Sequence, residues 1–437
     1  MVDRDVFKIL DLALRIGEML LSSGAGAADV TATMLGVTRA LGLRGVVADV
    51  TFTALALHHQ PGHDEPGTVQ TRRVTHREID YEDLTLVDHL VRDIVDGNVD
   101  RDGARSALAR IVSSGHRRPR WAVNLGWGAV GAGTALLLGG GIAITAVAFA
   151  AAVCIDKIQR AMTVRRMPAF YQQVAGGLFA TLLAAGIAAT GLDVEPSLVV
   201  TASIVMLLAG IGFVGATQDA LSGFPLTAGA RSLEAMLATA GIIAGVTGGF
   251  DLAEAMGVDL GRLDPGAYDL AGPALLTLGG AVASAAFAFS SYAPLRTLLP
   301  VALVGSLAST VYSLAVLAGV GPAWSTAVAA VAVGVISYSV AGRIRVPPLV
   351  VVMCGVIPLL PGLAIYRGLA QLALGQAGTL SLVGAAATAI ALASGAILGQ
   401  YLAQPLKREA RRLETRLSGP RLVGPLLGPL RSRGKRG

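Results

Sequence analysis

Two long apolar stretches of this chain are each interrupted near the middle by glycine or proline. One covers residues 207–219, with the sequence LLAGIGFVGATQD, and the other covers residues 355–367, GVIPLLPGLAIYR. In lipid, an opened helical backbone is tolerated only where it packs against protein or borders a wet cavity. Interrupted apolar segments at matching places in two halves of a chain are typical of a transporter's binding site. We therefore interpret the chain as a membrane transporter.

The composition agrees with a chain that lies mostly in a membrane. Of the 437 residues, 53% are hydrophobic and only 15% are charged, whereas roughly 25% are charged in a soluble domain. The net charge of +6 does not indicate nucleic-acid binding, because Lys and Arg cluster in short segments beside apolar runs. That placement is how proteins encode their orientation in a membrane.

Residues 1–118 differ in composition from the rest and are expected to form a cytosolic α+β domain. Asp29 is the expected cap of its second helix. Periodicity predicts, in chain order, two helices, two strands and two helices at 6–21, 30–41, 46–57, 68–75, 81–96 and 102–113.

This N-terminal part also holds all six histidines. The spacing of His58, His59, His63 and His76 around Asp64 matches no zinc pattern, so we expect no metal site. No nucleophile elbow or phosphate loop is present either. We therefore expect no cofactor and no enzymatic activity.

Ten apolar runs long enough to cross a bilayer follow. They cover residues 121–140, 141–160, 169–190, 197–219, 230–250, 271–290, 297–318, 323–342, 347–370 and 378–402. The first two leave open whether residues 121–160 form two spans or one. Basic loops lie on one side of these runs and acidic loops on the other, which predicts a plasma-membrane protein with both termini in the cytoplasm.

The ten predicted spans divide at an acidic extracytoplasmic linker, residues 251–270, into groups of five at 119–250 and 271–404. Because five is odd, the second group begins on the opposite side of the membrane, and we expect inverted repeats. The predicted fold class is thus a polytopic α-helical membrane protein of two inverted five-helix repeats with an N-terminal cytosolic α+β domain. Residues 405–437 are expected to form a basic cytoplasmic tail that contacts lipid.

No ionised side chain lies near the middle of a predicted span, which favours backbone groups at the two breaks, with hydroxyls and amides, as ligands of the cargo. A zwitterionic amino acid suits such a site, because its carboxylate can face half-helix N-termini and its ammonium group the freed carbonyls. The candidate substrate-binding or coupling residues are Gly210, Gly212, Thr217, Gln218, Asp219, Ser306, Thr310, Pro358, Pro361, Gly362 and Tyr366.

Several of these candidates have two interpretations. Asp219 either holds an ammonium group or a coupling proton, or it is a helix-end residue paired with Arg231. Ser306 and Thr310 either line a pathway or form hydrogen bonds between helices. Arg367 is interpreted as an anchor at the membrane surface.

Two motif pairs are similar to those of the threonine/serine exporter family, actinobacterial type. They are residues 210–219 with TAGAR at 227–231, and PLLPG at 358–362 with YR at 366–367. The resemblance covers residues 5–403. It implies a cytosolic N-terminal domain, ten spans in two halves, and export of threonine and serine driven by the proton gradient. One departure is Ala-Gly at 209–210, where the family pattern has Pro-Gly.

The leading hypothesis is therefore a secondary antiporter that exports threonine and serine by alternating access, with amino acid, protons and membrane lipid as partners. A homo-oligomer is left open. One alternative changes the cargo to a small carboxylate such as succinate. Another, of a different class, is a membrane-anchored sensor or enzyme acting through residues 1–118.

Overall fold

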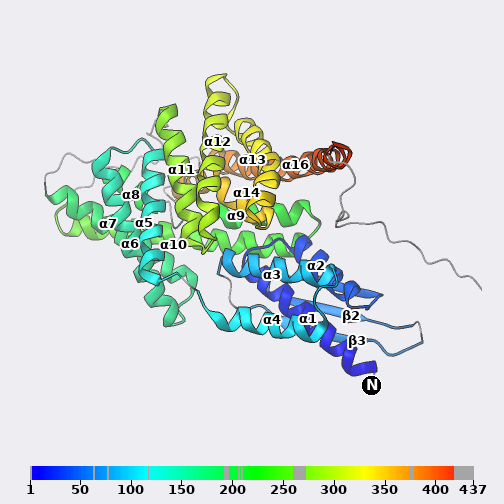
Figure 1. Cartoon of the computed structure of the whole chain (residues 1–437). Helices are drawn as coiled ribbons and strands as arrows, with labels where there is room; N and C mark the ends of the chain where they lie inside the picture. The colour runs from blue at the N-terminus through cyan, green and yellow to red at the C-terminus, as the bar shows by residue number, and fades with distance from the viewer. Residues whose placement is uncertain are drawn as a thin grey trace, which may run out of the picture.

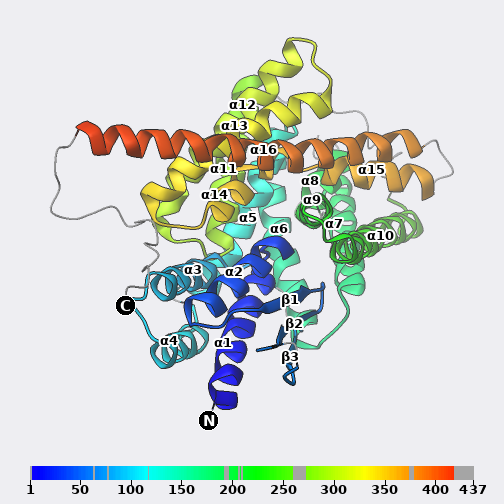
Figure 2. The ribbon, with the colours of Figure 1, turned by 90° about the vertical axis from the view of Figure 1, so that its right-hand side faces the viewer.

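The computed structural model describes residues 2–62, 64–75, 78–116, 118–190, 196–204, 207, 210–258, 272–373 and 378–417. Residues 2–116, called here the N-terminal segment, lie on one side of the long helices that follow, as both views show (Figures 1 and 2). His63 and His76, two of the histidines considered above, fall outside the described residues.

The N-terminal segment contains four helices and a three-stranded antiparallel sheet. The elements are α1 (Val2–Ser22), α2 (Ala27–Ala40), β1 (Val46–Val50), β2 (Ala54–His59), β3 (Thr68–Arg73), α3 (Tyr81–Val95) and α4 (Arg101–Ser114). The strand order is β1-β2-β3. The prediction of one strand over 46–57 is wrong, because the chain turns back after β1, where the Thr51 amide donates to the Ala54 carbonyl (2.9 Å).

Local sequence explains the start of α3. The Asp80 carboxylate accepts hydrogen bonds from the Glu82 and Asp83 amides at the start of α3, 3.0 Å each, which satisfies two amides that have no partner within the helix. The expected cap of α2 by Asp29 is wrong. The N-cap residue there is Gly26, and it supplies no side-chain hydrogen bond.

The rest of the described chain is helical. The elements are α5 (Arg120–Leu137), α6 (Ile142–Val164), α7 (Ala169–Ala189), α8 (Pro196–Ile204), α9 (Gly210–Leu221), α10 (Pro225–Ala255), α11 (Pro273–Ser290), η2 (Leu295–Thr297), α12 (Leu298–Leu317), α13 (Pro322–Ile344), α14 (Pro348–Gly355), η3 (Ile357–Leu359), α15 (Gly362–Ala373) and α16 (Thr379–Leu417). Residues 121–160 form two helices, α5 and α6, with Gly139 at a positive φ of 77° between them.

Length and hydropathy identify membrane-spanning candidates among these helices. Within the described residues, seven are long and apolar enough to cross a membrane, or eight if the bent pair α14 and α15 forms one span. Each of the ten predicted spans coincides with one helix or with two helices separated by a break. α16 continues without a break through residue 404, and the linker residues 259–271 and the tail from 418 lie outside the described residues.

The helix contacts after residue 119 follow one pattern twice. α7 packs along α10, and α13 packs along α16 in the same way. The pair α5–α6 corresponds to α11–α12, and the pair α9–α10 corresponds to α15–α16. Glycine permits the closest of these contacts. A Cβ atom at Gly245 would lie 2.1 Å from the Val174 carbonyl oxygen, and one at Gly399 would lie 2.4 Å from that of Val331.

Candidate functional site

Helical structure is interrupted at the second of the two places where the sequence predicts it, because a 3-10 turn, η3, stands between α14 and α15. At the first place, α8 ends at Ile204 and α9 begins at Gly210, and of the residues between them the structure describes only Leu207. The axis bends by 44° between α14 and the η3–α15 stretch. Pro358 and Pro361 lie in this second break, where each lacks a backbone amide donor.

The two breaks meet in space, although they are about 150 residues apart in sequence. A Cβ atom built on Gly210 would lie 3.1 Å from the Leu360 Cβ and 3.5 Å from the Gly362 Cα. α9 and α15 therefore start side by side, and the missing side chain of Gly210 allows that approach. The first amides of a helix have no partner within it and carry partial positive charge, so two positive helix ends converge at this point.

A cavity of about 570 Å³, called here the central cavity, lies at this meeting point. Its volume is within the roughly 300–1,000 Å³ of small-molecule sites. Four predicted candidates line it: Gly210, Pro358, Pro361 and Gly362. Its other polar lining comes from Thr134, Ser309, Tyr312, Thr326 and Thr388 on α5, α12, α13 and α16.

Arg367 is the only charged residue among those that line the central cavity in the described part of the chain. It lies five residues after the start of α15, within the first turns of that half-helix. The interpretation of Arg367 as a surface anchor did not predict this position at the cavity wall. Its distance from Gly362 along one short helix is the sequence signal that could have placed it beside the break.

The remaining predicted candidates do not line the central cavity. They are Gly212, Thr217, Gln218, Asp219, Ser306, Thr310 and Tyr366. Thr310 Oγ1 lies 3.0 Å from Thr277 Oγ1 on α11, which is the helix-to-helix hydrogen bond named as the alternative. Ser309, the adjacent residue on α12, faces the cavity instead.

Asp219 is almost fully buried, with its side chain 1% exposed, and is held by two partners. Its Oδ2 lies 3.2 Å from a guanidinium nitrogen of Arg231, so the pairing alternative is confirmed. Its Oδ1 accepts a hydrogen bond of 2.9 Å from the amide of Ala27, the first residue of α2. Asp219 thus supplies from α9 the cap that α2 lacks in its own sequence.

Arg231 extends the same contact, because it donates to the Ala25 carbonyl at 3.1 Å. The second half has an uncharged pair at the corresponding position. Gln371, nine residues after Gly362 as Asp219 is nine after Gly210, accepts a hydrogen bond of 2.8 Å from Ser381. The ionic pair of the first half therefore also holds the start of α2, whereas the uncharged pair joins α15 to α16 within the second half.

The N-terminal segment also reaches the central cavity directly. Ile79, just before α3, lines that cavity. The neighbouring Tyr81 amide donates to the Ser291 carbonyl at 2.9 Å, and the Tyr81 ring meets the Phe287 ring edge-to-face with centroids 6.3 Å apart. Burial holds the pKa of Tyr81 well above its ordinary value, so the phenol stays neutral.

Comparisons with known proteins agree along most of the chain. A family model described as "Putative threonine/serine exporter" matches residues 11–253, and one described as "Threonine/Serine exporter, ThrE" matches residues 277–402. A Mycobacterium tuberculosis protein named "Probable threonine/serine exporter" is 35% identical over 425 residues, covering 94% of this chain and 80% of the relative. A Corynebacterium glutamicum protein named "Threonine/serine exporter" is 34% identical over 411 residues, covering 92% and 84%. No solved structure matches.

Proposed function

The chain belongs to the threonine/serine exporter family, and from this we propose that it is a secondary active transporter that exports threonine and serine across the plasma membrane in exchange for protons. The observation that carries the proposal is the contact of Gly210 with Gly362 at the wall of the central cavity. This contact places two half-helix N-termini and one guanidinium beside a cavity of suitable volume.

The cargo carboxylate binds at the breaks, where the first amides of α9 and α15 and the Arg367 guanidinium converge. The ammonium group faces backbone carbonyls at the second break, where Pro358 and Pro361 remove the amides that would donate to carbonyls one helical turn earlier. Neither group requires a charged residue beyond Arg367, which fits the lining that the structure describes.

The side-chain hydroxyl of threonine or serine contacts one of the hydroxyls in the lining, such as Ser309 or Thr326. A site that forms a hydrogen bond to a cargo hydroxyl discriminates strongly against a cargo that lacks it, because the buried partner is then left unsatisfied. Threonine and serine are therefore preferred over valine and alanine.

The transporter works by alternating access between two five-helix repeats of inverted topology, each crossing the membrane five times. The doubled contact pattern of α5–α10 and α11–α16 supports this arrangement. The N-terminal segment lies in the cytoplasm and closes the central cavity on that side, which its contact through Ile79 supports. Opening toward the cytoplasm then requires this segment to move away from α9 and α11.

A small dicarboxylate such as succinate is the second candidate cargo. Arg367 and two positive helix ends favour anions, and no Asp or Glu lines the central cavity in the described part of the chain. Threonine remains the first choice because the lining also carries several hydroxyls.

Counterflow in proteoliposomes separates these two cargoes. Vesicles are loaded with unlabelled threonine or succinate, and uptake of labelled threonine or succinate is followed. We expect labelled threonine to accumulate in threonine-loaded but not in succinate-loaded vesicles, and an outward-directed amino-acid flux to rise with an imposed proton gradient. Accumulation of succinate alone would contradict the assignment of cargo.

Arg367→Gln tests the site itself. It should raise the half-saturating threonine concentration at least tenfold, because a charge-assisted contact to the carboxylate is lost. Arg343→Gln is the matched control, since Arg343 is an exposed arginine at the end of α13. Equal transport by both variants would remove Arg367 from the site.

A further inference from the structure

A separate cavity of about 810 Å³ lies within the N-terminal segment and is called here the N-terminal cavity. It opens between α1 and α4, with β3 and the start of α3 completing its wall. Its charged residues are Arg15, Glu18, Arg72, Glu78, Asp80, Asp83, Arg105 and His116. Such a concentration of charge around a hollow of ligand size marks a candidate binding site.

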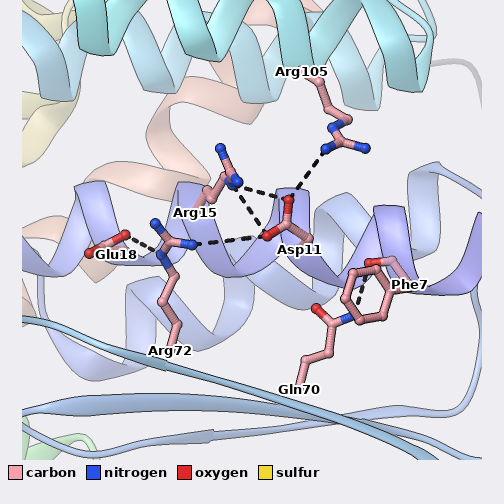
Figure 3. Close-up of polar contacts among 7 residues, drawn as sticks. All are labelled: Phe7, Asp11, Arg15, Glu18, Gln70, Arg72 and Arg105. Atoms are coloured by element: carbon pink, nitrogen blue, oxygen red, sulfur yellow. Dashed lines mark hydrogen bonds and ion pairs between the residues drawn. The ribbon is translucent and has the colours of Figure 1, made fainter.

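The first end of this cavity is cationic. Figure 3 shows the side chains of Arg15, Arg72 and Arg105 converging on Asp11 from α1, β3 and α4. Their nitrogens lie 3.0, 3.9 and 3.7 Å from its carboxylate oxygens, and Arg72 also pairs with Glu18. Three guanidinium groups against two carboxylates leave one positive charge at this end.

The second end is acidic. Asp80 uses Oδ1 to cap α3, while its Oδ2 lies 3.2 Å from His116 Nε2. Asp83 is half-buried, and its carboxylate has no hydrogen bond or ion pair to any residue that the structure describes. Partial burial and then the neighbouring Asp80 raise the pKa of Asp83 to about 6, against the opposing effect of His116. Asp83 is thus a carboxylate that no cation pairs with among the described residues.

The two ends border one cavity, so a molecule that fills this cavity contacts both. Along α1 the lining runs from Leu12 to Ser23. We propose that the N-terminal cavity binds a small zwitterion, such as an amino acid or a short peptide, with its ammonium group at Asp83 and Asp80 and its carboxylate at Arg15 and Arg105.

The position of the cavity assigns a regulatory role to this ligand. Glu78 and Asp80 line the N-terminal cavity, whereas Ile79 between them lines the central cavity. Ser22 and Ser23 line the N-terminal cavity too, and the chain continues from them into residues 25–27, which Arg231 and Asp219 hold. A ligand that draws these segments inward therefore acts on the Ile79 contact with the central cavity and on the contact of residues 25–27 with Asp219 and Arg231. This regulatory part rests on the proposed function, but the binding part does not.

Equilibrium binding to the full-length protein in lipid nanodiscs tests the proposal. Labelled L-threonine and labelled threonyl-threonine are the probes, and Arg367→Gln is present throughout to weaken binding in the central cavity. We expect saturable binding of at least one probe. Asp83→Asn and Arg105→Gln should each raise its Kd at least tenfold, whereas Arg105→Lys should restore part of the affinity.

Asp93→Asn on α3 and Arg110→Gln on α4 are the matched controls, because both residues are exposed and neither lines the cavity. They should leave the Kd within twofold. Ethanolamine and propionate, which each carry one of the two charged groups, should compete at least tenfold more weakly than the zwitterion. Absence of saturable binding, unchanged affinity in both cavity variants, or equal competition by propionate would overturn the proposal.

The transport assay keeps the two proposals apart. If the proposed function is wrong, the protein without substitutions fails to move threonine in proteoliposomes, whatever the binding assay gives. If the protein transports threonine, ligand on the cytoplasmic side should change its efflux rate at least threefold, and Asp83→Asn should abolish that change. An unchanged rate would refute the regulatory part alone.

Discussion

Removal of the Asp219 carboxylate should release the start of α2. Asp219 is 1% exposed and Arg231 is 11% exposed, so the pair is buried. Truncating one partner of a buried ion pair costs about 3–5 kcal/mol, because the other charge is left without compensation. Since 1.4 kcal/mol is about a factor of ten, Asp219→Ala should favour the opened contact by roughly a hundredfold or more.

Hydrogen exchange followed by mass spectrometry measures this opening. Peptides that cover residues 24–31 should exchange about a hundredfold faster in Asp219→Ala. In Asp219→Asn the increase should be smaller, because an amide oxygen can still accept from Ala27. Peptides from α4 should not change. Gln371→Ala, in the corresponding pair of the second half, is the control and should leave residues 24–31 protected.

A double-mutant cycle completes the test. If the pair acts as a unit, combining Asp219→Ala with Arg231→Ala should cost clearly less than the sum of the single substitutions. If residues 24–31 of Asp219→Ala exchange at a rate within threefold of that in the unsubstituted protein, the assignment of Asp219 as the cap of α2 is refuted. Proton-dependent threonine efflux should also be lost in Asp219→Asn, and undiminished efflux would remove Asp219 from transport.

Three further outcomes are expected. Gly210→Ala should lower threonine efflux in proteoliposomes more than tenfold, because its Cβ meets the other break, whereas Gly248→Ala, whose Cβ meets nothing within 4 Å, should not. The raised pKa of folded Asp83 means that its carboxyl favours folding below about pH 4 and that this contribution is lost as the pH rises through about 6. Asp83→Asn should therefore make the thermal unfolding midpoint depend less on pH between about pH 4 and 6. An unchanged pH dependence in this variant would contradict the raised pKa of Asp83. Gly245→Ala and Gly399→Ala should each destabilise the fold by about 1–3 kcal/mol in thermal unfolding, and a neutral effect in either would contradict the close helix contact.

Periodicity was enough to place the helices, because apolar spacing and span length depend on local sequence. It predicted the break between α14 and α15, and the two family matches end and begin at 253 and 277, near the predicted linker at 251–270. It missed the turn that divides the strand over 46–57, since three polar or aromatic residues there, TFT, carry no glycine or proline signal.

The candidate site was predictable only in part. Gly210 and Gly362 are identifiable because glycine weakens a helix in the middle of an apolar run and lets another backbone approach closely. The pairing of Asp219 with Arg231 was among the predicted alternatives, but its cap of α2 was not predictable, because the partner is a backbone amide 192 residues away. Contacts of that kind depend on tertiary packing.

The difference between Asp219 with Arg231 and Gln371 with Ser381 makes two otherwise similar halves unequal. In the transport cycle proposed above, opening toward the N-terminal segment would separate the Asp219 cap from α2 beside a buried charge pair, while the corresponding contact of the other half, Gln371 with Ser381, is a neutral hydrogen bond. The two faces should therefore open at different speeds, although the gradients alone set the final distribution of cargo. An exporter built this way would spend most of its cycle closed toward the compartment that holds its N-terminal segment. Its turnover would be limited by how often the contact of Asp219 with α2 opens.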